Sequence, residues 1–377
     1  MSDTSIRLGD VATYINGYAF KPEDRGNEGL PIIRIQDLTG NAYDLGFYNG
    51  DYPEKIEIND GDVLISWSAS LGVYIWNRGK ALLNQHIFKV SFDKAPIDKQ
   101  YFVYAVRHKL AEMGSKTHGA TMKHIVKKDF DAILIPYPSI SEQEDIALKL
   151  NKASRIIEAR QQELQKLDNL IKARFVEMFG DPADISRKDK VELSEICEKI
   201  TDGEHGSVAR VPNGHPFLNA KQILKNGRID WDTITYVGDE DHQRIYKRCN
   251  PVEGDILLTT TGTIGNVAIM PKAEEVSMDR GITLIKIDRQ KVTSEFVAEL
   301  LKQPSIQTEM GVNVHASAIG HLFMNRVKKL PAILPSMESQ AEFTAFVRQV
   351  DKSKVAVQKS LDETQLLFNS LMQKYFG

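Results

Sequence analysis

The residues best suited to chemistry are histidines that recur in two similar stretches of the chain. His118 and His124 lie in KTHGATMKH, and His315 and His321 lie in NVHASAIGH at the same offset. A metal site needs further close ligands, such as cysteines or clustered carboxylates, and neither stretch supplies them. Such histidines are common in polar loops, but they could also face a ligand. On the functional interpretation, both stretches contact a ligand, and Lys123 in the first stretch contacts it as well.

Patterns for catalysis are missing elsewhere as well. The run from Thr261 to Asn266 follows an expected strand but lacks the Gly-Lys-Ser/Thr ending of a phosphate-binding loop, so a structural turn is expected. No glycine fingerprint of a dinucleotide or methyl-donor cofactor is visible. Cys197 and Cys249 lack metal-site spacing and are expected to be free buried thiols. We therefore predict a protein without catalytic groups, cofactor or metal.

The chain repeats itself once, and the repeat includes both strands and helices. Residues 61–66 (GDVLIS) correspond to residues 254–259 (GDILLT), and a long helical pattern at 146–180 corresponds to one at 343–377. A repeat of two long units is not a solenoid, which stacks shorter units at least three deep. It predicts a duplicated module, each copy being a globular domain followed by a helix.

Both helical patterns place apolar residues at coiled-coil spacing. A capping box at Ser139 and Glu142, or at Ser141 and Glu144, would open the first helix, and Gly180 suits a left-handed cap at its end. A helix of roughly 35 residues is about 50 Å long, so a pair of them could set a fixed distance between the two domains. The residues expected to form this seam and to bind partners are Leu150, Ile157, Arg160, Leu164, Leu167, Ile171, Val350, Val357, Leu361, Phe368 and Leu371.

The segments outside the helices have mixed character. Residues 31–38 (PIIRIQDL), 63–66 and 87–92 are expected to be strands and residues 100–113 a helix, which predicts α+β domains rather than βαβ units. The predicted fold is two similar globular domains separated by an antiparallel pair of long coiled-coil helices. The predicted boundaries are a first domain at 1–145, a helix at 146–180, a linker at 181–191, a second domain at 192–342 and a helix at 343–377.

Composition limits the function classes. The chain has 377 residues, 42% of them hydrophobic and 26% charged, which is typical of a soluble protein with more than one domain. It begins without an apolar signal peptide and has no run long enough to cross a bilayer, so a cytoplasmic protein without membrane contacts is expected. Unaided DNA binders are usually basic, whereas this net charge is −3. If the chain binds DNA, partners should supply part of the positive surface.

Polar residues at equivalent positions of the two domains differ in type. Arg34 and Gln36 align with Asn219 and Lys221. Such side chains can hydrogen-bond to base edges in the major groove. Different residues at equivalent positions would let two similar domains read different sequences. We predict DNA contacts at these four residues, at the four repeated histidines and at Lys123.

These features resemble the DNA-specificity subunit of type I restriction-modification systems. In the first half, the resemblance rests on INGYAFK at residues 15–21, GLPIIRIQDL at 29–38, GDVLIS at 61–66, NQH at 84–86 and ILIPYPSISEQEDI at 133–146. The second half departs from this pattern. There, Asp279-Arg280-Gly281 replaces NQH, and Ser339 replaces the glutamate before Gln340.

The resemblance implies a non-catalytic reader of DNA. Each globular domain would be a target recognition domain that binds one half of a split sequence, and the two helices would be spacers that set the gap. It also implies partners: double-stranded DNA, two methyltransferase subunits docked on the spacer helices, and translocating restriction-nuclease subunits. Two alternatives stay open. One is a specificity subunit paired with a fused methyltransferase-nuclease, and the other is a coiled-coil scaffold whose domains bind protein.

Overall fold

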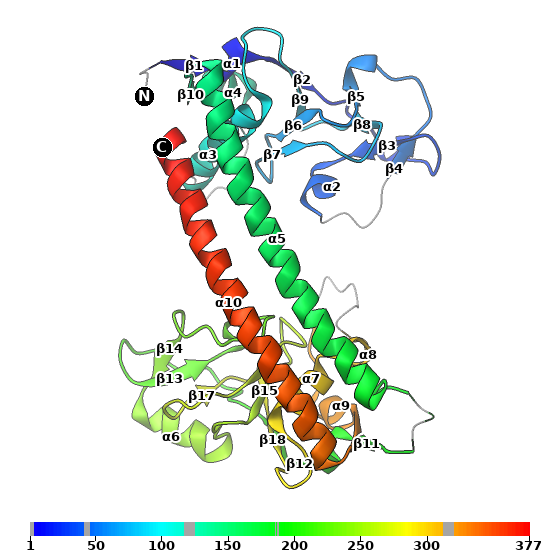
Figure 1. Ribbon diagram of the computed structural model, residues 1–377, viewed down its shortest axis with the longest axis vertical. Coiled ribbons are helices and arrows are strands. Elements are labelled where there is room, and N and C mark those ends of the chain that lie inside the picture. Colours follow the sequence, from blue (N-terminus) through cyan, green and yellow to red (C-terminus); the bar gives the residue numbers. More distant parts are fainter. Residues whose placement is uncertain (1–3, 41–45, 117–124, 185, 187, 312–319) are drawn as a thin grey trace. The chain divides into compact units, whose positions relative to one another are not determined.

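The structure, a computed structural model, describes residues 4–40, 46–116, 125–184, 186, 188–311 and 320–377 (Figure 1). The chain forms two compact units. Unit 1 is Met1–Arg160 with Ser360–Gly377, and unit 2 is Gln161–Lys359. Each unit combines sheets with a part of both long helices, which confirms the α+β prediction.

Unit 1 is built from short strands and helices before the first long helix. In chain order they are β1 (Ser5–Arg7), α1 (Leu8–Val11), β2 (Thr13–Asn16), η1 (Pro22–Asp24), β3 (Leu30–Ile33), α2 (Ile35–Thr39), β4 (Gly46–Tyr48), η2 (Glu54–Ile56), β5 (Glu57–Ile58), β6 (Val63–Ser66), β7 (Gly72–Ile75), β8 (Ala81–Leu83), β9 (Ile87–Ser91), α3 (Lys99–Lys116), α4 (Lys127–Asp131) and β10 (Leu134–Pro136). One sheet has the antiparallel order β2-β9-β6-β7. Another has the order β4-β3-β8-β5, with β3 and β8 parallel.

Unit 2 repeats this plan. Its elements are β11 (Lys190–Glu192), η3 (Leu193–Ile196), β12 (Cys197–Asp202), β13 (His215–Leu218), η4 (Ala220–Gln222), β14 (Thr235–Val237), α6 (Asp239–Arg248), β15 (Ile256–Thr259), β16 (Val267–Ile269), β17 (Ser277–Met278), β18 (Ile282–Ile287), α7 (Ser294–Leu301), α8 (Pro304–Glu309), α9 (Met324–Lys328) and β19 (Pro331–Ile333). The order β12-β18-β15-β16 matches the first sheet of unit 1. The parallel pair of β13 and β17 matches β3 and β8.

A central strand divides the core of each unit in two. Every residue of β6 is buried, and so is every residue of β15. Because successive side chains point to opposite faces of a strand, Val63 and Ile65 join one apolar cluster while Leu64 joins another. In unit 2, Ile256 and Leu257 separate in the same way. The continuous apolar runs that stood out in the repeat are therefore strands covered on both faces.

The two long helices are α5 (Ile140–Phe179) and α10 (Met337–Phe376). At the start of α5, the Ser139 Oγ accepts a hydrogen bond from the Glu142 N–H, and a Glu142 carboxylate oxygen accepts one from the Ser139 N–H. This confirms one of the two predicted capping boxes. At its end, Gly180 has φ of +76°, and its N–H donates to the Val176 carbonyl. That left-handed conformation suits glycine and ends the helix, as predicted.

A buried glutamine in the first turn ties each long helix to its own unit. The Gln143 Oε1 accepts from the Asp98 N–H at 2.9 Å, and its Nε2 donates to the Pro138 carbonyl. In unit 2, the Gln340 Oε1 accepts from the Thr293 N–H at 2.9 Å, and its Nε2 donates to the carbonyls of Pro335 and Lys291. Both helices therefore begin in the same hydrogen-bonded setting.

The long helices pack antiparallel within each unit. In unit 1, Leu150 near the start of α5 lies in one apolar cluster with Met372 and Phe376 near the end of α10. In unit 2 the ends are reversed, because Phe175 near the end of α5 packs on Phe343 near the start of α10 with ring centroids 5.5 Å apart. Lys354 also forms an ion pair with Asp168 at 2.8 Å. This confirms the predicted antiparallel pair.

Several local predictions differ from the structure. The strand expected at 31–38 ends at Ile33 and is followed by α2, because an Asp37 carboxylate oxygen accepts from the Arg34 N–H and starts a helical turn. β11 begins inside the segment expected to be a linker, since it pairs with β19. The helices begin at Ile140 and Met337, ahead of the predicted domain boundaries, which stay predictions. In the described ranges, no helix is long and apolar enough to span a membrane.

Candidate nucleic-acid interface

In unit 1, the loop after β2, the loop after β6 and the turn before β9 meet at one end of the sheet β2-β9-β6-β7. Ile125 joins them there. We call this meeting point the loop junction. The Gln85 N–H donates to the Tyr18 carbonyl at 2.8 Å, and the Trp67 N–H donates to the His86 carbonyl at 3.2 Å. The Ile125 N–H then donates to the Trp67 carbonyl at 3.0 Å. Backbone bonds therefore set the position of every loop in this junction.

Unit 2 has the same junction, bond for bond. The Arg280 N–H donates to the Glu204 carbonyl at 2.9 Å, and the Thr260 N–H donates to the Gly281 carbonyl at 2.8 Å. The Leu322 N–H donates to the Thr260 carbonyl at 2.8 Å, as Ile125 does to Trp67 in unit 1. The two junctions thus share one backbone framework.

A glycine permits the close approach of two loops in each junction. A Cβ on Gly17 would lie 2.0 Å from the Asn84 carbonyl oxygen, and a Cβ on Gly203 would lie 2.2 Å from the Met278 carbonyl oxygen. Neither contact can relax easily, because the obstructing atoms belong to the backbone. The glycines of Asn16-Gly17 and Asp202-Gly203 therefore have a packing role.

The side chains on this framework are aromatic or amide in unit 1. The Trp67 Nε1–H donates to the Asn16 Oδ1 at 3.3 Å, and the Trp67 ring meets the edge of His86 at 5.0 Å between centroids. Tyr18 is 45% exposed, and Gln85 is exposed at the tip of its turn. This junction offers flat apolar surface with amide donors and acceptors.

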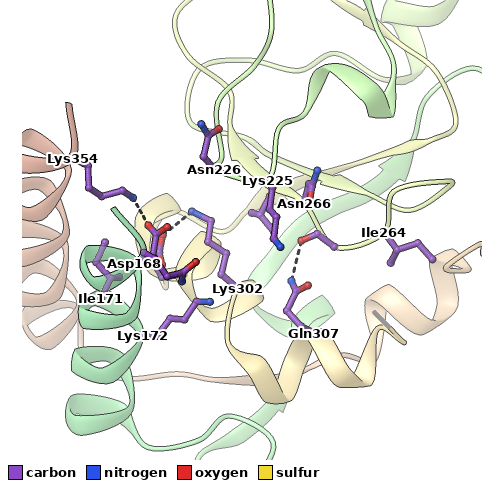
Figure 2. Close-up of a pocket in the computed structure, with 14 residues that line it drawn as sticks. Asp168, Ile171, Lys172, Lys225, Asn226, Ile264, Asn266, Lys302, Gln307 and Lys354 are labelled. Carbon is purple, nitrogen blue, oxygen red and sulfur yellow. Dashed lines mark hydrogen bonds and ion pairs between the residues drawn. The ribbon is translucent and has the colours of Figure 1, made fainter. Parts of the chain in front are cut away.

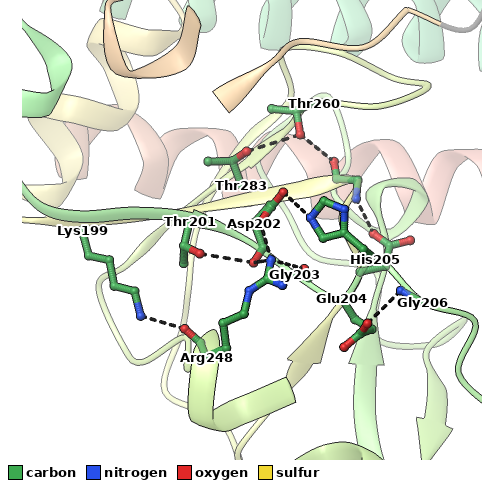
Figure 3. Close-up of polar contacts among 12 residues, drawn as sticks. Lys199, Thr201, Asp202, Gly203, Glu204, His205, Gly206, Arg248, Thr260 and Thr283 are labelled. Carbon is green, nitrogen blue, oxygen red and sulfur yellow. Dashed lines mark hydrogen bonds and ion pairs between the residues drawn. The ribbon is translucent and has the colours of Figure 1, made fainter. Parts of the chain in front are cut away.

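In unit 2 the corresponding side chains are mostly charged (Figure 3). Asp202 accepts from the Arg248 guanidinium and lies 2.6 Å from the His205 Nε2. Glu204 pairs with Arg244, and a hydrogen bond from the Gly206 N–H is the main cause that lowers the pKa of Glu204. The guanidinium groups of α6 are thereby held against the junction loops rather than left free to bind phosphate.

The predicted base contacts lie beside the junction. The Asn84 N–H donates to the carbonyl of Ile33, which directly precedes Arg34. The Arg34 guanidinium is tied to Asp37, with its Nε 3.2 Å from the Oδ2 of that carboxylate, and Gln36 is exposed. Of the two residues, Arg34 is therefore already paired with a carboxylate of the protein, whereas Gln36 is exposed.

The corresponding pair in unit 2 has the same position. The Asp279 N–H donates to the carbonyl of Leu218, which precedes Asn219. The Asn219 N–H is capped by the buried Gln222 side chain at 3.0 Å, while Lys221 is exposed. Contact of these side chains with DNA stays a prediction.

The histidine loops are only partly described. His118, Lys123, His124 and His315 lie outside the described residues. The His321 Nδ1 lies 2.7 Å from the Thr261 Oγ1, and its ring meets the edge of Phe323 at 4.7 Å. Among the described residues, no group of histidines, cysteines and carboxylates could hold a metal.

Both cysteines are free, and burial raises the pKa of each thiol to about 12. Cys249 is buried as expected, whereas Cys197, at the first position of an edge strand, is only half-buried. The thiols are therefore neutral near pH 7, which suits packing rather than reaction.

Sequence reasoning missed the tips of the junction turns, Gln85 and Arg280. Both are exposed, and both donate their N–H to the equivalent loop. The repeat did align NQH with Asp279-Arg280-Gly281, so the signal was present. From the sequence alone, the difference between NQH and Asp279-Arg280-Gly281 looked like the loss of a motif. The backbone hydrogen bonds show that both turns have the same place in the junction and differ only in their side chains.

The predicted seam of the long helices mostly faces inward. Leu150, Ile171, Val350 and Val357 are buried, and the other predicted seam residues, Arg160 among them, are half-buried. Different apolar residues are exposed on these helices and were not predicted. The most exposed of them are Leu148 (69% exposed), Val355 (70%), Leu366 (71%) and Leu367 (55%).

Known proteins resemble the chain along nearly its whole length. It is 24% identical to the type I restriction enzyme EcoBI specificity subunit of Escherichia coli, with 98% of this chain and 83% of that protein covered. It is 22% identical to the MjaVIII specificity subunit of Methanocaldococcus jannaschii, with 92% and 85% covered. A solved structure of the type I restriction-modification S subunit from M. genitalium superposes with a TM-score of 0.52 at 17% identity, covering 99% and 96%.

The repeated unit is itself a recognised domain. The family model described as "Type I restriction modification DNA specificity domain" matches twice, at residues 4–169 and 188–364. Each match begins before the first sheet of one unit and extends into a long helix. Together the matches cover well over half of the chain. The chain therefore belongs to the family of type I restriction-modification DNA-specificity proteins.

Proposed function

We propose that the chain is the non-catalytic DNA-reading subunit of a type I restriction-modification complex, and that each unit reads one half of a split sequence. The observation that carries the proposal is the pair of loop junctions. One backbone framework occurs twice, with Tyr18, Trp67 and Gln85 on one copy and Glu204, Thr260 and Arg280 on the other. Sequence is read by side chains that differ, while a common frame fixes where they lie.

We propose that the DNA contacts lie on this framework and beside it. The predicted set is Arg34, Gln36, His118, Lys123, His124, Asn219, Lys221, His315 and His321. To it we add the turn tips Gln85 and Arg280, which are exposed and held by backbone bonds. Glutamine can bond bidentately to adenine, and arginine to guanine, in the major groove. The two half-sites should therefore differ in sequence.

The helix pair is proposed to set the gap between half-sites. Each long helix is 40 residues long and contributes one end to the core of each unit. A helix fixes distance because every residue adds about 1.5 Å of rise. Inserting residues between Leu164 and Ile171 should therefore change the gap without changing the half-sites. A changed half-site with an unchanged gap would argue against the spacer role.

The same helices are proposed to dock two methyltransferase subunits, which the translocating nuclease subunits then join. The exposed apolar residues Leu148, Val355, Leu366 and Leu367 suit such partners, because apolar side chains gain stability when a partner covers them. Replacing Leu366 and Leu367 with serine should weaken assembly and leave the folded monomer intact. Assembly at wild-type affinity would place the docking surface elsewhere.

The decisive experiment is to express the chain with its methyltransferase partner and map methylated bases across the host genome. We expect methylation at one motif whose two specified parts are separated by a fixed unspecified gap. The chain alone should bind DNA weakly, since its net charge is −3. Methylation without a split motif would contradict the proposal. A complex with no nucleic-acid affinity would favour the scaffold alternative.

A further inference from the structure

Four lysines from separate segments of unit 2 line one recess (Figure 2). We call it the lysine recess. Lys172 comes from α5, Lys354 from α10, Lys302 from the C-terminal end of α7, and Lys225 from the loop after η4. The space they surround is about 400 Å³. Such convergence from four places differs from a run of basic residues along one helix face.

The charges in the recess do not balance. Lys354 pairs with Asp168 at 2.8 Å and with Asp351 at 3.2 Å, and Lys302 pairs with Glu299 at 2.8 Å. Lys172 and Lys225 have no carboxylate partner among the described residues. Like charges held near one another repel, and an anion between them removes that repulsion. The lysine recess therefore favours an anionic occupant.

The walls of the recess are held in place by a side-chain hydrogen bond and by a glycine turn. The Gln307 Nε2 donates to the Gly265 carbonyl at 3.0 Å, which ties α8 to the hairpin of β15 and β16. The turn that carries Lys225 closes through Gly227, whose φ is +80°, and a Cβ there would lie 3.4 Å from the Lys302 Nζ. The recess is thus a built feature of the fold.

The recess adjoins the loop junction of unit 2. Thr260, which directly follows β15, belongs to the junction. Residues 264–267, farther along the same β15–β16 hairpin, line the recess. DNA seated at the junction would bring a row of phosphates past the same hairpin. Phosphates recur at short intervals along each strand, so several separate lysines suit this ligand.

We infer that the lysine recess binds backbone phosphates of the DNA whose bases unit 2 reads. The inference rests on the proposed DNA-reading function. It gives the helix pair a second role, because Lys172 and Lys354 belong to α5 and α10 and would touch the duplex directly. Phosphate contacts of this kind add affinity without sequence preference and set the register of the bases on the reading side chains.

The test measures how DNA affinity of the assembled methyltransferase complex depends on salt. A double variant, Lys172→Gln with Lys225→Gln, removes the two lysines that have no carboxylate partner. The control, Lys166→Gln with Lys352→Gln, removes two exposed lysines of α5 and α10 that lie outside the recess. The probe is a duplex that contains the motif found by methylation mapping. Each complex is titrated from about 50 to about 200 mM salt.

We expect the recess variant to lower the slope of log affinity against log salt by about 1.8, or about 0.9 for each phosphate that is no longer neutralised. Its affinity should fall about tenfold or more, with the preferred motif unchanged. The control should keep the wild-type slope. Equal slopes in both variants would overturn the inference. So would weakened methyltransferase binding at an unchanged slope, since the occupant would then be an acidic protein segment.

Failure of the proposed function would look different. In that case the wild-type complex would bind all duplexes equally, and no motif would emerge from methylation mapping. If the wild type reads a motif and the recess variant behaves like the control, only the lysine recess is excluded as a phosphate site.

Discussion

The two loop junctions differ in their side chains but not in their backbone. In unit 1 the Trp67 ring stacks on Phe88 at 5.5 Å and meets the edge of His86, whereas Thr260 occupies the equivalent place in unit 2 and lies 3.3 Å from the Thr283 Oγ1. Tyr18 in unit 1 corresponds to Glu204, which pairs with Arg244. A frame made only of backbone bonds tolerates these exchanges, because no frame bond depends on a side chain.

The largest expected effect comes from adding a side-chain atom at the glycine where two loops approach closely in each junction. Gly17→Ala and Gly203→Ala each place a Cβ against a carbonyl oxygen, so each should destabilise its unit by about 3 kcal/mol. Urea unfolding would measure this loss. Gly238→Ala is the matched control, since nothing lies within 4 Å of its added Cβ and φ there is −72°. If only one unit is affected, the two frames are not equivalent.

The next effect concerns the buried glutamines at the starts of the two long helices, whose replacement should cost different amounts of stability. Gln143→Leu would leave the Asp98 N–H without its partner, at a cost of about 2 kcal/mol. Gln340→Leu should cost more, because Gln340 also donates to the Lys291 carbonyl. Thermal unfolding of both variants, with the exposed Gln162→Leu as control, checks the order. Equal losses would show that the additional bond contributes nothing.

The turn tips test whether differing side chains carry sequence preference. Gln85→Arg should alter only the half-site read by unit 1, and Arg280→Gln only the other one. The preference at one base pair should change by about 1.5 kcal/mol, or roughly tenfold. Methylation mapping in cells measures both half-sites and the gap at once. Two unchanged half-sites would remove the turn tips from the reading surface.

The smallest effect is a dependence on pH that the loop junction of unit 2 should show and that of unit 1 should not. The pKa of Glu204 is lowered from its ordinary value of 4.5, so its ionised form stabilises the folded unit above that pH. This stability, less than about 1 kcal/mol, should be lost as the pH falls from about 4.5 through the lowered pKa. Glu204→Gln should flatten this acid limb in urea unfolding, and Tyr18→Phe should not. Identical acid limbs for wild type and Glu204→Gln would contradict the assignment.

Much of the fold follows from short-range patterns in the sequence. The burial of β6 and β15, the Ser139–Glu142 cap and the left-handed Gly180 each depend on a few neighbouring residues. The duplication was visible without any structure, because equivalent residues recur in the same order in both halves. Pairing of the two long helices then follows from their heptad patterns, since each helix needs a partner for its apolar face.

Tertiary structure decided the features that join distant residues. β11 became a strand because β19 pairs with it, and no local pattern reveals a partner so far along the chain. The strand expected through Arg34 ends at Ile33 because a helical turn buries Asp37 there. The lysine recess needs Lys172, Lys225, Lys302 and Lys354 to meet in space. Short-range periodicity specifies elements, whereas the position of one side chain against another depends on how the whole core packs.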